Sequence, residues 1–302
     1  MPDFGIFRGF SESAFSDKLF AGKLPTELGN NGYIGILDLY INASAAYSLR
    51  LLRNAYTGAS IRVRRSSDNT EQNIGFTATG GLDTSALTSF CGASNGFVTT
   101  WYDQSNNGNN VTQTTAINQP QIVQNGIILY GNNKPTIKFD GINDNLGTTF
   151  TNVPIFPITM TTISNTTGIT DAGLIGFGNA GSLRREFWQE ITSSGKVKFG
   201  YYGDDLPNGF ATGIFNNIQL LYTAIVTNTF VQNGYGNGNL AGTYNSSSQY
   251  IGNGAFNIGK GRQDSLGKFI NGNIQEVIIY PIDQSSNRTN IESNINSYYG
   301  IY

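Results

Sequence analysis

Short runs of β-branched and aromatic residues recur along the chain from Tyr33 to its end, and clusters of glycine, asparagine, serine and aspartate separate them. Runs of this kind are typical of β-strands, and the clusters are typical of tight turns. The runs span residues 60–65, 97–102, 127–130, 136–139, 158–163, 174–177, 196–202, 218–226 and 274–280. So many short strands predict an all-β protein, built as an antiparallel sandwich of two sheets.

Two stretches have helical periodicity instead. Apolar residues recur about every third position within residues 43–54, with Arg50 and Arg53 outside, which predicts a short helix. A second helix is predicted at the end of the chain, where Ser286 could cap the start and Gly300 could end it. We therefore expect only a few short helices beside the sandwich.

Aromatic and aliphatic side chains crowd into the first 31 residues, which end at a Gly-Asn-Asn-Gly break. So short a segment cannot bury them by itself. It could lie across the main domain, as chain termini often do, or be buried in another subunit, since interface cores are rich in aromatic residues. We favour the second interpretation, which makes residues 1–31 an extended assembly arm and residues 32–302 the main domain. The assembly contacts would come from Phe4, Phe7, Phe10, Phe15 and Phe20.

The charge composition argues against nucleic acid as a partner. Charged residues make up 13% of the chain, and 18 Lys and Arg against 20 Asp and Glu give a formal net charge of -2. No excess of cations is left to neutralise phosphates. The one dense basic run, Arg62, Arg64 and Arg65, alternates as a strand would, so an anion site there is the lesser alternative.

The chain has no histidine, and this excludes a Ser-His-Asp or Cys-His nucleophile. Zinc would need carboxylate ligands almost alone, and we expect no metal and no other cofactor. The single cysteine, Cys91, excludes an intrachain disulfide framework. The start lacks a basic region followed by an apolar core, and no segment approaches the roughly 20 apolar residues of a membrane span. We therefore expect synthesis in the cytosol, without a signal peptide and without membrane contact.

Two features could bind a ligand. Residues 140–145 (DGINDN) offer closely spaced oxygen atoms that could hold calcium, although Asx-Gly clusters are first of all turn formers, and a plain turn is the favoured interpretation. Trp188, Tyr201 and Tyr202 lie on or beside predicted strands and could stack against sugar rings. Strand aromatics are more often core or cross-strand partners, so both interpretations stay open.

The most specific pattern lies within residues 48–113, which contain SIRVRRSSDN, GGLDTSALTSFC and WYDQS followed by Gly108 and Asn109. In these residues the chain resembles the catalytic domain of the fungal and bacterial α-L-arabinofuranosidase B family. The resemblance covers about a third of the chain and implies a concanavalin A-like sandwich, or jelly roll. It also implies that the polar residues Asp103, Gln104, Ser105 and Asn107 form a buried network that shapes a loop. Glu276, in a strand pattern common to such sandwiches, is interpreted as structural.

The family's activity depends on two carboxylates, one that attacks the sugar and one that protonates the leaving group. The family's nucleophile strand corresponds to residues 187–192 (FWQEIT), which would make Glu190 the nucleophile, while the position of a second functional aspartate holds Trp188. The family's acid position falls on Gln263, which cannot donate a proton to a leaving group. Asp264 could replace it only if the loop shifted by one residue.

The family's cysteines are also missing. Its adjacent cysteine pair has no counterpart, and its disulfide between cysteines five residues apart is reduced to Cys91, with Gly96 in the partner position. Loss of disulfides suits a reducing compartment. Together with Gln263, this leads us to expect that the catalytic activity is lost, with no catalytic residues and no enzyme.

A second resemblance concerns the whole chain. The FGIFRGF and DKLFAGKLPTELG segments, joined to a concanavalin-like body, are similar to structural proteins of tailed phages, of the head fibre, decoration, collar or tail fibre type. We therefore expect a virion structural protein, located in the virion. Its arm would dock to other virion proteins or to sister subunits in a homo-oligomer, and its sandwich would face cell-surface or environmental glycans. Two alternatives stay open: a retaining glycoside hydrolase of the α-L-arabinofuranosidase type, with Glu190 and Asp264, and a free carbohydrate-binding lectin.

Overall fold

The computed structural model of the chain describes residues 33–168, 171–178, 187–201, 204–205, 215–246, 254–261 and 268–302. The proposed arm, with Phe4, Phe7, Phe10, Phe15 and Phe20, lies outside the described residues, so the boundary at residue 31 stays a prediction. The strands are β1 (Ala45–Ser48), β2 (Ile61–Arg65), β3 (Glu71–Ile74), β4 (Gly96–Trp101), β5 (Val111–Thr112), β6 (Gln121–Gln124), β7 (Ile127–Ile128), β8 (Tyr130–Gly131), β9 (Lys134–Pro135), β10 (Ile137–Asp140), β11 (Leu146–Thr149), β12 (Ile158–Thr166), β13 (Ala172–Phe177), β14 (Phe187–Ile191), β15 (Val197–Tyr201), β16 (Asp204–Asp205), β17 (Leu220–Val226), β18 (Val231–Gly236), β19 (Asn239–Asn245), β20 (Ala255–Ile258) and β21 (Asn271–Tyr280). The helices are α1 (Ile36–Leu39), α2 (Thr84–Cys91), the short 3-10 helix η3 (Ala116–Asn118) and α3 (Arg288–Tyr299).

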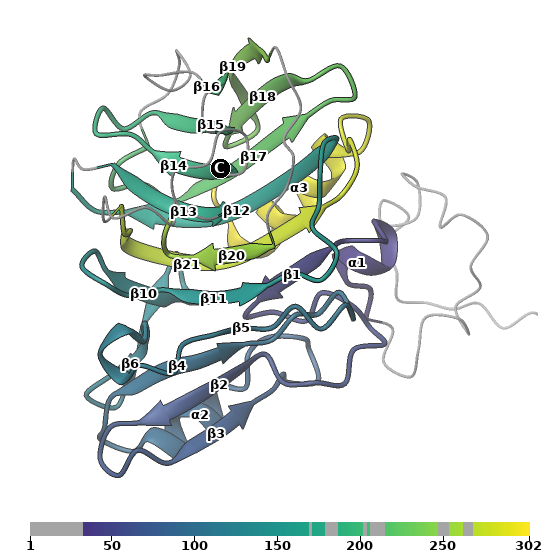
Figure 1. Cartoon of the computed structure of the whole chain (residues 1–302). Helices are drawn as coiled ribbons and strands as arrows, with labels where there is room; N and C mark the ends of the chain where they lie inside the picture. Colours follow the sequence, from purple (N-terminus) through teal and green to yellow (C-terminus); the bar gives the residue numbers. More distant parts are fainter. Residues whose placement is uncertain are drawn as a thin grey trace, which may run out of the picture.

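The strands form two antiparallel layers packed face to face (Figure 1). In one layer β1 and β10 both pair with β21, and β12, β17, β18 and β19 follow in that order. In the other, the order is β3, β2, β4, β5, β11, β20, β13, β14, β15 and β16. Strand β6 pairs with both β4 and β10 and so joins the layers at one end. The predicted two-sheet antiparallel sandwich is confirmed.

The core between the layers is rich in phenylalanine. Phe256 on β20 lies 4.6 Å from Phe177 on β13 between ring centroids, and Phe187 on β14 lies 4.6 Å from Phe199 on β15. These side chains are buried, as are the apolar residues of β12, β17 and β21 that face them. Burial of this apolar surface is the main force that holds the two layers together.

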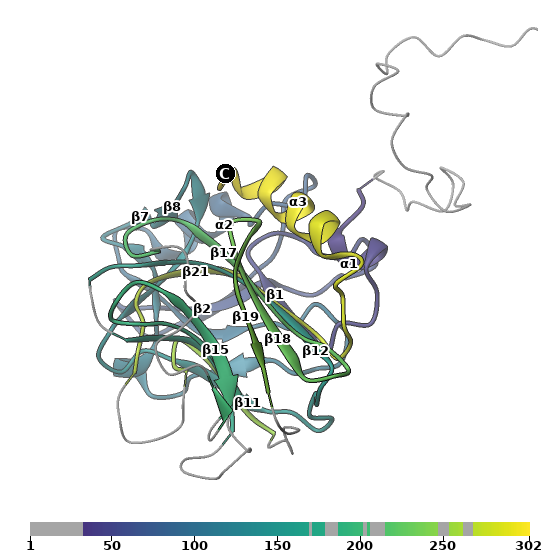
Figure 2. The same ribbon diagram turned by 90° about the horizontal axis from the view of Figure 1, so that it is seen from above.

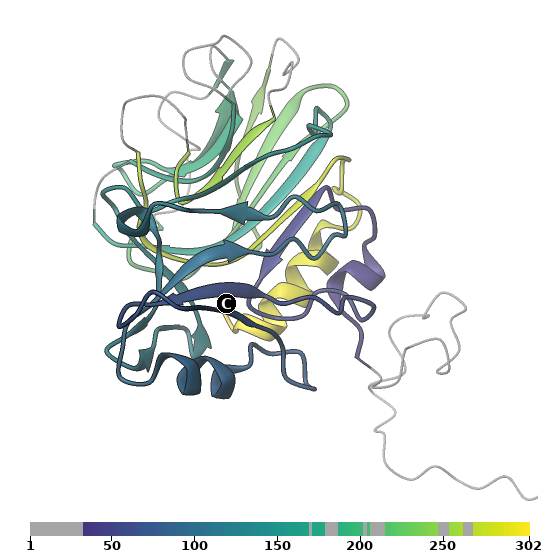
Figure 3. The same cartoon turned by 60° about the horizontal axis from the view of Figure 1, so that its bottom comes forward.

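Helix α3 covers the outer face of the β1, β21, β12 and β17 layer. Its residues Ile291, Ile295 and Tyr299 form a second buried cluster with Ile278 of β21 and Leu221 of β17. Figures 2 and 3 show α3 beside α1 on this flank of the molecule. The predicted closing helix is therefore confirmed. Gly300 ends it in the left-handed conformation (φ 61°), although Asn287 and not Ser286 stands at the N-cap position.

The predicted helix over residues 43–54 is wrong. Residues Ala45–Ser48 are strand β1, whose partner is β21, with Ala45 opposite Ile279. All four strand residues are buried, so the apolar spacing reflects a segment covered on both faces and not a helix face. Conversely, the pattern gave no prediction of α2, where the Asp83 carboxylate accepts a hydrogen bond from Ala86 N at 2.9 Å and caps the helix.

The WYDQS run shapes a polar network, as predicted, which is buried at Asp103 and Gln104 but exposed at Asn107. The Asp103 carboxylate accepts hydrogen bonds from Ala46 N, Ser105 N, Ser105 Oγ and Asn109 N at 2.8–3.1 Å. The Gln104 side chain accepts from Leu52 N and donates to Ser48 O, at the end of β1, and to Arg50 O. Asn107 Nδ2 donates to Ala43 O at 2.9 Å. The run thus ties the loop after β4 to β1.

Glu276 is structural, as predicted, and lies in a buried ion pair. Arg50 donates through Nε to Glu276 Oε2 at 2.8 Å and through Nη2 to Oε1 at 3.0 Å. Arg50 Nη1 donates to Asn294 Oδ1 on α3 at 3.0 Å, and the guanidinium lies 5.0 Å from the ring centroid of Tyr298. The segment after β1, strand β21 and helix α3 are therefore held at one point by one pair of charges.

Gly96 packs against the thiol of Cys91. A Cβ atom added at Gly96 would lie 2.8 Å from Cys91 Sγ and 3.1 Å from atoms of Val63 and Val123. This is the position where the family resemblance implies the other half of a disulfide. A side chain at Gly96 would therefore lie close enough to the Cys91 thiol to bond with it.

Replacing Gly96 with cysteine is expected to let a disulfide to Cys91 form on oxidation. Closing so short a loop restricts the unfolded chain, and we expect oxidised Gly96→Cys to gain about 2 kcal/mol of unfolding free energy over its reduced form. Thiol titration and urea unfolding measure both effects. Gly75→Cys is the control, because a Cβ at Gly75 meets no atom within 4 Å. If thiol titration still finds two free thiols in Gly96→Cys after treatment with an oxidant, the expectation is wrong.

Candidate active site

Glu190 lies on β14 between two neighbouring strands, β13 and β15. Phe187 and Ile191 of β14 face the core between the layers. Because side chains alternate along a strand, Trp188 and Glu190 lie on the opposite face. In the strand register Glu190 stands opposite Lys198 of β15. Its side chain is only 2% exposed, so a carboxylate is buried on this outer face of the layer.

Charged groups surround the Glu190 carboxylate. Lys268 Nζ lies 3.4 Å from Glu190 Oε2, and Lys198 Nζ lies 3.6 Å from Glu190 Oε1. Lys268 Nζ also lies 3.0 Å from Asp171 Oδ2. Asp171 in turn accepts a hydrogen bond from Ser193 N at 2.6 Å. The cluster therefore holds two carboxylates and two ammonium groups, with Lys268 bridging the carboxylates.

Lys268 lies beside Glu190 because its backbone packs closely against Gly173 of β13. A Cβ at Gly173 of β13 would lie 1.9 Å from Gly261 N and 2.7 Å from Lys268 O, so only glycine fits there. Gly173 N donates a hydrogen bond to Lys268 O at 3.2 Å. The segments before residue 262 and after residue 267 thus both lie against β13, beside Glu190.

Burial and charge oppose each other at Glu190. Burial raises the pKa of the Glu190 carboxyl, and the neighbouring Lys268 and Lys198 ammonium groups lower it; the net direction is upward. At Asp171 burial also acts against the charged form, but the hydrogen bonds from Lys268 and Ser193 N prevail and the pKa is lowered. For Lys268, the two carboxylates outweigh burial and raise its pKa. The cluster is thus a network of paired charges at neutral pH.

Two lysine ammonium groups beside Glu190 favour its carboxylate form, which is the form that a nucleophile needs. Burial acts in the opposite direction, since it raises the pKa of Glu190 and disfavours the carboxylate. Asp171 has a lowered pKa and therefore stays ionised, so it is a poor general acid. An acid for glycoside cleavage would have to come from another residue. Both candidates from the sequence, Gln263 and Asp264, lie outside the described residues.

The three aromatic residues proposed to stack on sugar, Trp188, Tyr201 and Tyr202, do not form one described surface. Trp188 is 1% exposed, and Lys198 Nζ lies 5.8 Å from its ring centroid, so its ring faces the charge cluster from within the protein. Tyr201 ends β15, opposite Phe187, and Tyr202 lies outside the described residues. The sugar-stacking role stays a prediction, and for Trp188 it would require removal of its present cover.

Lys198, Lys268 and Asp171 were missed by the sequence reasoning. A weak signal existed for Lys198, because a lysine at an alternating position inside the apolar run VKFGY marks the face opposite the core. No comparable signal existed for Lys268, which is 78 positions from Glu190 in sequence and reaches it through the contact with Gly173.

The turn over residues 140–145 is confirmed. Asp140 Oδ1 accepts hydrogen bonds from the backbone N–H groups of Ile142, Asn143 and Asp144 at 2.8–3.3 Å, and Asp144 Oδ2 accepts one from Asp140 N at 3.0 Å. Within the described ranges, no three Cys, Asp or Glu side chains form a group that could hold a metal ion. No helix in the described part of the chain is long and apolar enough to cross a membrane.

The basic run identified in the sequence is paired with neighbouring groups. Arg62 forms an ion pair with Glu71, and Arg65 forms one with Asp68 at 2.6 Å. Arg64 donates to Gln119 Oε1 at 2.7 Å and to Asn69 Oδ1 at 2.8 Å. The run therefore serves local structure, and the strand interpretation holds.

Sequence comparison identifies relatives for one part of the chain. Residues 38–130 match the family model of the catalytic domain of alpha-L-arabinofuranosidase B. A probable alpha-L-arabinofuranosidase B of Aspergillus flavus and the alpha-L-arabinofuranosidase B of Aspergillus oryzae are both 39% identical to this chain over 85 residues. The aligned stretch is 26% of this chain and 17% of either relative. The family-model match ends at residue 130, before Glu190.

Structural comparison extends the likeness to most of the chain. A crystal structure of an arabinofuranosidase complexed with arabinofuranosyl-α-1,2-xylobiose has a TM-score of 0.65 and 19% sequence identity, over 87% of this chain and 64% of that one. A mutant GH54 α-L-arabinofuranosidase soaked with 4-nitrophenyl α-L-arabinofuranoside has a TM-score of 0.66 at the same identity, over 65% of its chain. This chain has the sandwich fold of those enzymes and spans about two thirds of their length.

These findings overturn the functional prediction. The matched family and these relatives are arabinofuranosidases, so a non-enzymatic virion structural protein located in a virion was the wrong expectation. The alternative, a glycoside hydrolase of the α-L-arabinofuranosidase type, is the one that these findings favour. The error has a physical cause: an aromatic-rich arm indicates apolar surface in need of a partner, but it does not specify the partner. Binding of sister subunits or of glycans stays a prediction.

Proposed function

We propose that this protein is a glycoside hydrolase of the α-L-arabinofuranosidase type, with Glu190 as the nucleophile. The observation that carries the proposal is the buried Glu190 carboxylate between the Lys198 and Lys268 ammonium groups, on the strand where the family resemblance implies the nucleophile. The match of residues 38–130 to the family model and the shared sandwich fold support it.

In this proposal the reaction proceeds with retention. Glu190 attacks the anomeric carbon and forms a covalent glycosyl-enzyme bond, while an acid protonates the leaving oxygen. Water then cleaves the glycosyl-enzyme bond, and the same acid residue, now ionised, takes a proton from it. The Lys198 and Lys268 groups hold Glu190 in place and compensate its charge in a buried site.

Asp264 is the proposed acid. In the sequence it comes between Gly261 and Lys268, and these two described residues lie against β13 close to Glu190. Asp171 is excluded from this role by its lowered pKa. Trp188 occupies the position of a second functional aspartate of the family, so the sugar contacts on that side must differ from those of the relatives.

Hydrolysis of 4-nitrophenyl α-L-arabinofuranoside by the purified chain tests the proposal. We expect nitrophenolate release that is proportional to protein concentration and that follows saturation kinetics. The matched control is 4-nitrophenyl β-D-glucopyranoside, which has the same leaving group on a different sugar ring and should not be cleaved. Equal cleavage of both substrates, or release no faster than in buffer, would count against an arabinofuranosidase.

A further inference from the structure

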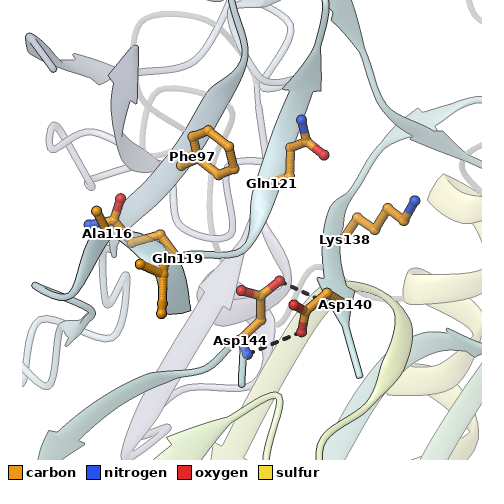
Figure 4. A pocket seen from close by; sticks show the side chains of 8 residues that line it. Phe97, Ala116, Gln119, Gln121, Lys138, Asp140 and Asp144 are labelled. Carbon is orange, nitrogen blue, oxygen red and sulfur yellow. Dashed lines mark hydrogen bonds between the residues drawn. The ribbon is translucent and has the colours of Figure 1, made fainter. Parts of the chain in front are cut away.

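A separate pocket opens where β4, β6 and β10 meet, and none of the residues that line it lies on β13, β14 or β15 (Figure 4). Its volume is about 290 Å³. Phe97 of β4 forms one wall and Gln121 of β6 lies beside it, while Gln119 and Asp144 form the base. The volume is at the lower end of the range for small-molecule sites, so the pocket suits a ligand of one ring.

Asp144 presents an unused acceptor to this pocket. The residue is 6% exposed, and its Oδ2 is held by Asp140 N at 3.0 Å. Its other oxygen, Oδ1, has no hydrogen bond within the described part of the chain and lies on the side of Asp144 that faces Gln119 (Figure 4). Burial, together with the charge of Asp140, raises the pKa of Asp144 to about 6. Because Oδ1 is not fully buried, it is open to the pocket and can accept a hydrogen bond from a ligand hydroxyl.

Contacts within the protein already hold the side chains beside Asp144 in place without a ligand. The Arg64 guanidinium lies 4.9 Å from the ring centroid of Phe97 and donates to Gln119 Oε1 at 2.7 Å. Gln119 Nε2 donates to Gln113 O at 2.9 Å, so both ends of this amide are held. Gln121 Nε2 donates to Val123 O at 3.0 Å, which leaves its Oε1 as a second acceptor in the pocket. Such preorganisation lowers the entropic cost of binding.

The chemistry of the lining fits a sugar better than a metal ion. A calcium ion takes six to eight oxygen ligands, but Asp140 Oδ1 is already occupied by three backbone N–H groups and the exposed Lys138 adds a positive charge. Ile117, which is 74% exposed at the mouth, and the Phe97 ring add apolar surface that a metal site would not use. A sugar ring has hydroxyl groups at its edge and an apolar C–H face. These match the acceptor oxygens and the apolar surface of the pocket.

We propose that this pocket binds a single sugar unit of a glycan, at a site separate from Glu190. A hydroxyl group of the sugar donates to Asp144 Oδ1, and the apolar face of the ring packs on Phe97. The site holds the glycan without cleaving it. It would act as a second point of attachment and does not depend on the proposed hydrolysis.

The test measures binding of a soluble arabinoxylan by affinity electrophoresis and of L-arabinose and D-xylose by saturation-transfer NMR. The Glu190→Gln chain is used throughout, so that no probe is consumed. We expect Asp144→Asn to weaken arabinoxylan binding about tenfold, because the amide still accepts from Asp140 N but the ionised acceptor is lost. Phe97→Ala should weaken it to a similar extent. Asp68→Asn, in an exposed ion pair with Arg65, is the control and should bind normally.

Several results would overturn the proposal. One is the absence of binding of all three probes by the folded Glu190→Gln chain. Another is equal binding by Asp144→Asn and Asp68→Asn. Binding of calcium that displaces the sugars and is lost in Asp144→Asn would show a cation site instead. Finally, if arabinoxylan binds the wild-type chain but not Glu190→Gln, the sugar occupies the proposed active site and not this pocket.

Discussion

Glu190→Gln is expected to lose 4-nitrophenyl α-L-arabinofuranoside hydrolysis by about 10³-fold or more in kcat. Glutamine keeps the shape of the side chain, but a neutral amide cannot form the covalent bond to the sugar. Steady-state kinetics on both chains measure the loss. Glu71→Gln is the matched control, because Glu71 forms an exposed ion pair with Arg62 on β2, away from the cluster. Its kcat should be unchanged.

The pH profile of the wild-type chain provides a second readout of the same residue. Because only the ionised carboxylate attacks, kcat/KM should fall as the pH decreases through the pKa of Glu190. Burial raises that pKa above its ordinary value of 4.5, so the acidic limb should lie above pH 4.5. A Glu190→Gln loss smaller than tenfold, or an acidic limb below pH 4.5, would remove Glu190 from the role of nucleophile.

Arg50→Met is expected to lower the free energy of unfolding by about 3–5 kcal/mol. The Arg50 and Glu276 side chains are 6% and 1% exposed, so the variant leaves a buried carboxylate without its counter-charge. Ser48 Oγ still donates to Glu276 Oε2 at 2.7 Å, but a neutral hydroxyl compensates only part of the charge. The contacts of the guanidinium with Asn294 and Tyr298 of α3 are lost as well.

Urea unfolding of the wild-type chain, Arg50→Met, Arg62→Met and a double variant separates the loss of the buried charge pair from the loss of an exposed one. Arg62→Met, which breaks the exposed pair with Glu71, should cost less than about 1 kcal/mol. The double variant Arg50→Met with Glu276→Leu should recover much of the loss, because it leaves no unpaired charge. If Arg50→Met proves no more destabilising than Arg62→Met, the ion pair is not what joins β1, β21 and α3.

Most of the fold could be predicted from the pattern of residues. Strands such as β12 and β17 are long, β-branched and bounded by turn formers, so their sequence and their environment agree. The segment that became β1 could not be assigned in this way, because it is covered on both faces and its apolar residues recur with the spacing of a helix. Pairing with β21, far along the chain, decides its conformation.

The candidate site could be predicted only in part. Glu190 was singled out because the family resemblance implies a nucleophile on its strand. Its partners Lys198 and Lys268 could not, since an ion cluster depends on which strands are neighbours and on where a loop returns. The contact between Gly173 and Gly261 fixes that return, and neither glycine is distinguishable by sequence from the others in the chain.

The pairing of β1 with β21 also limits how this protein can be divided or recombined. The family match ends at residue 130, yet β1 within it hydrogen-bonds to residues 276–279 and is covered by α3 near the end of the chain. A fragment that ends at residue 130 would expose an unpaired strand edge and an apolar face, both of which promote aggregation. The recognisable third of the sequence is therefore not a transferable module. Any chimera with a relative must exchange both ends of the sandwich together.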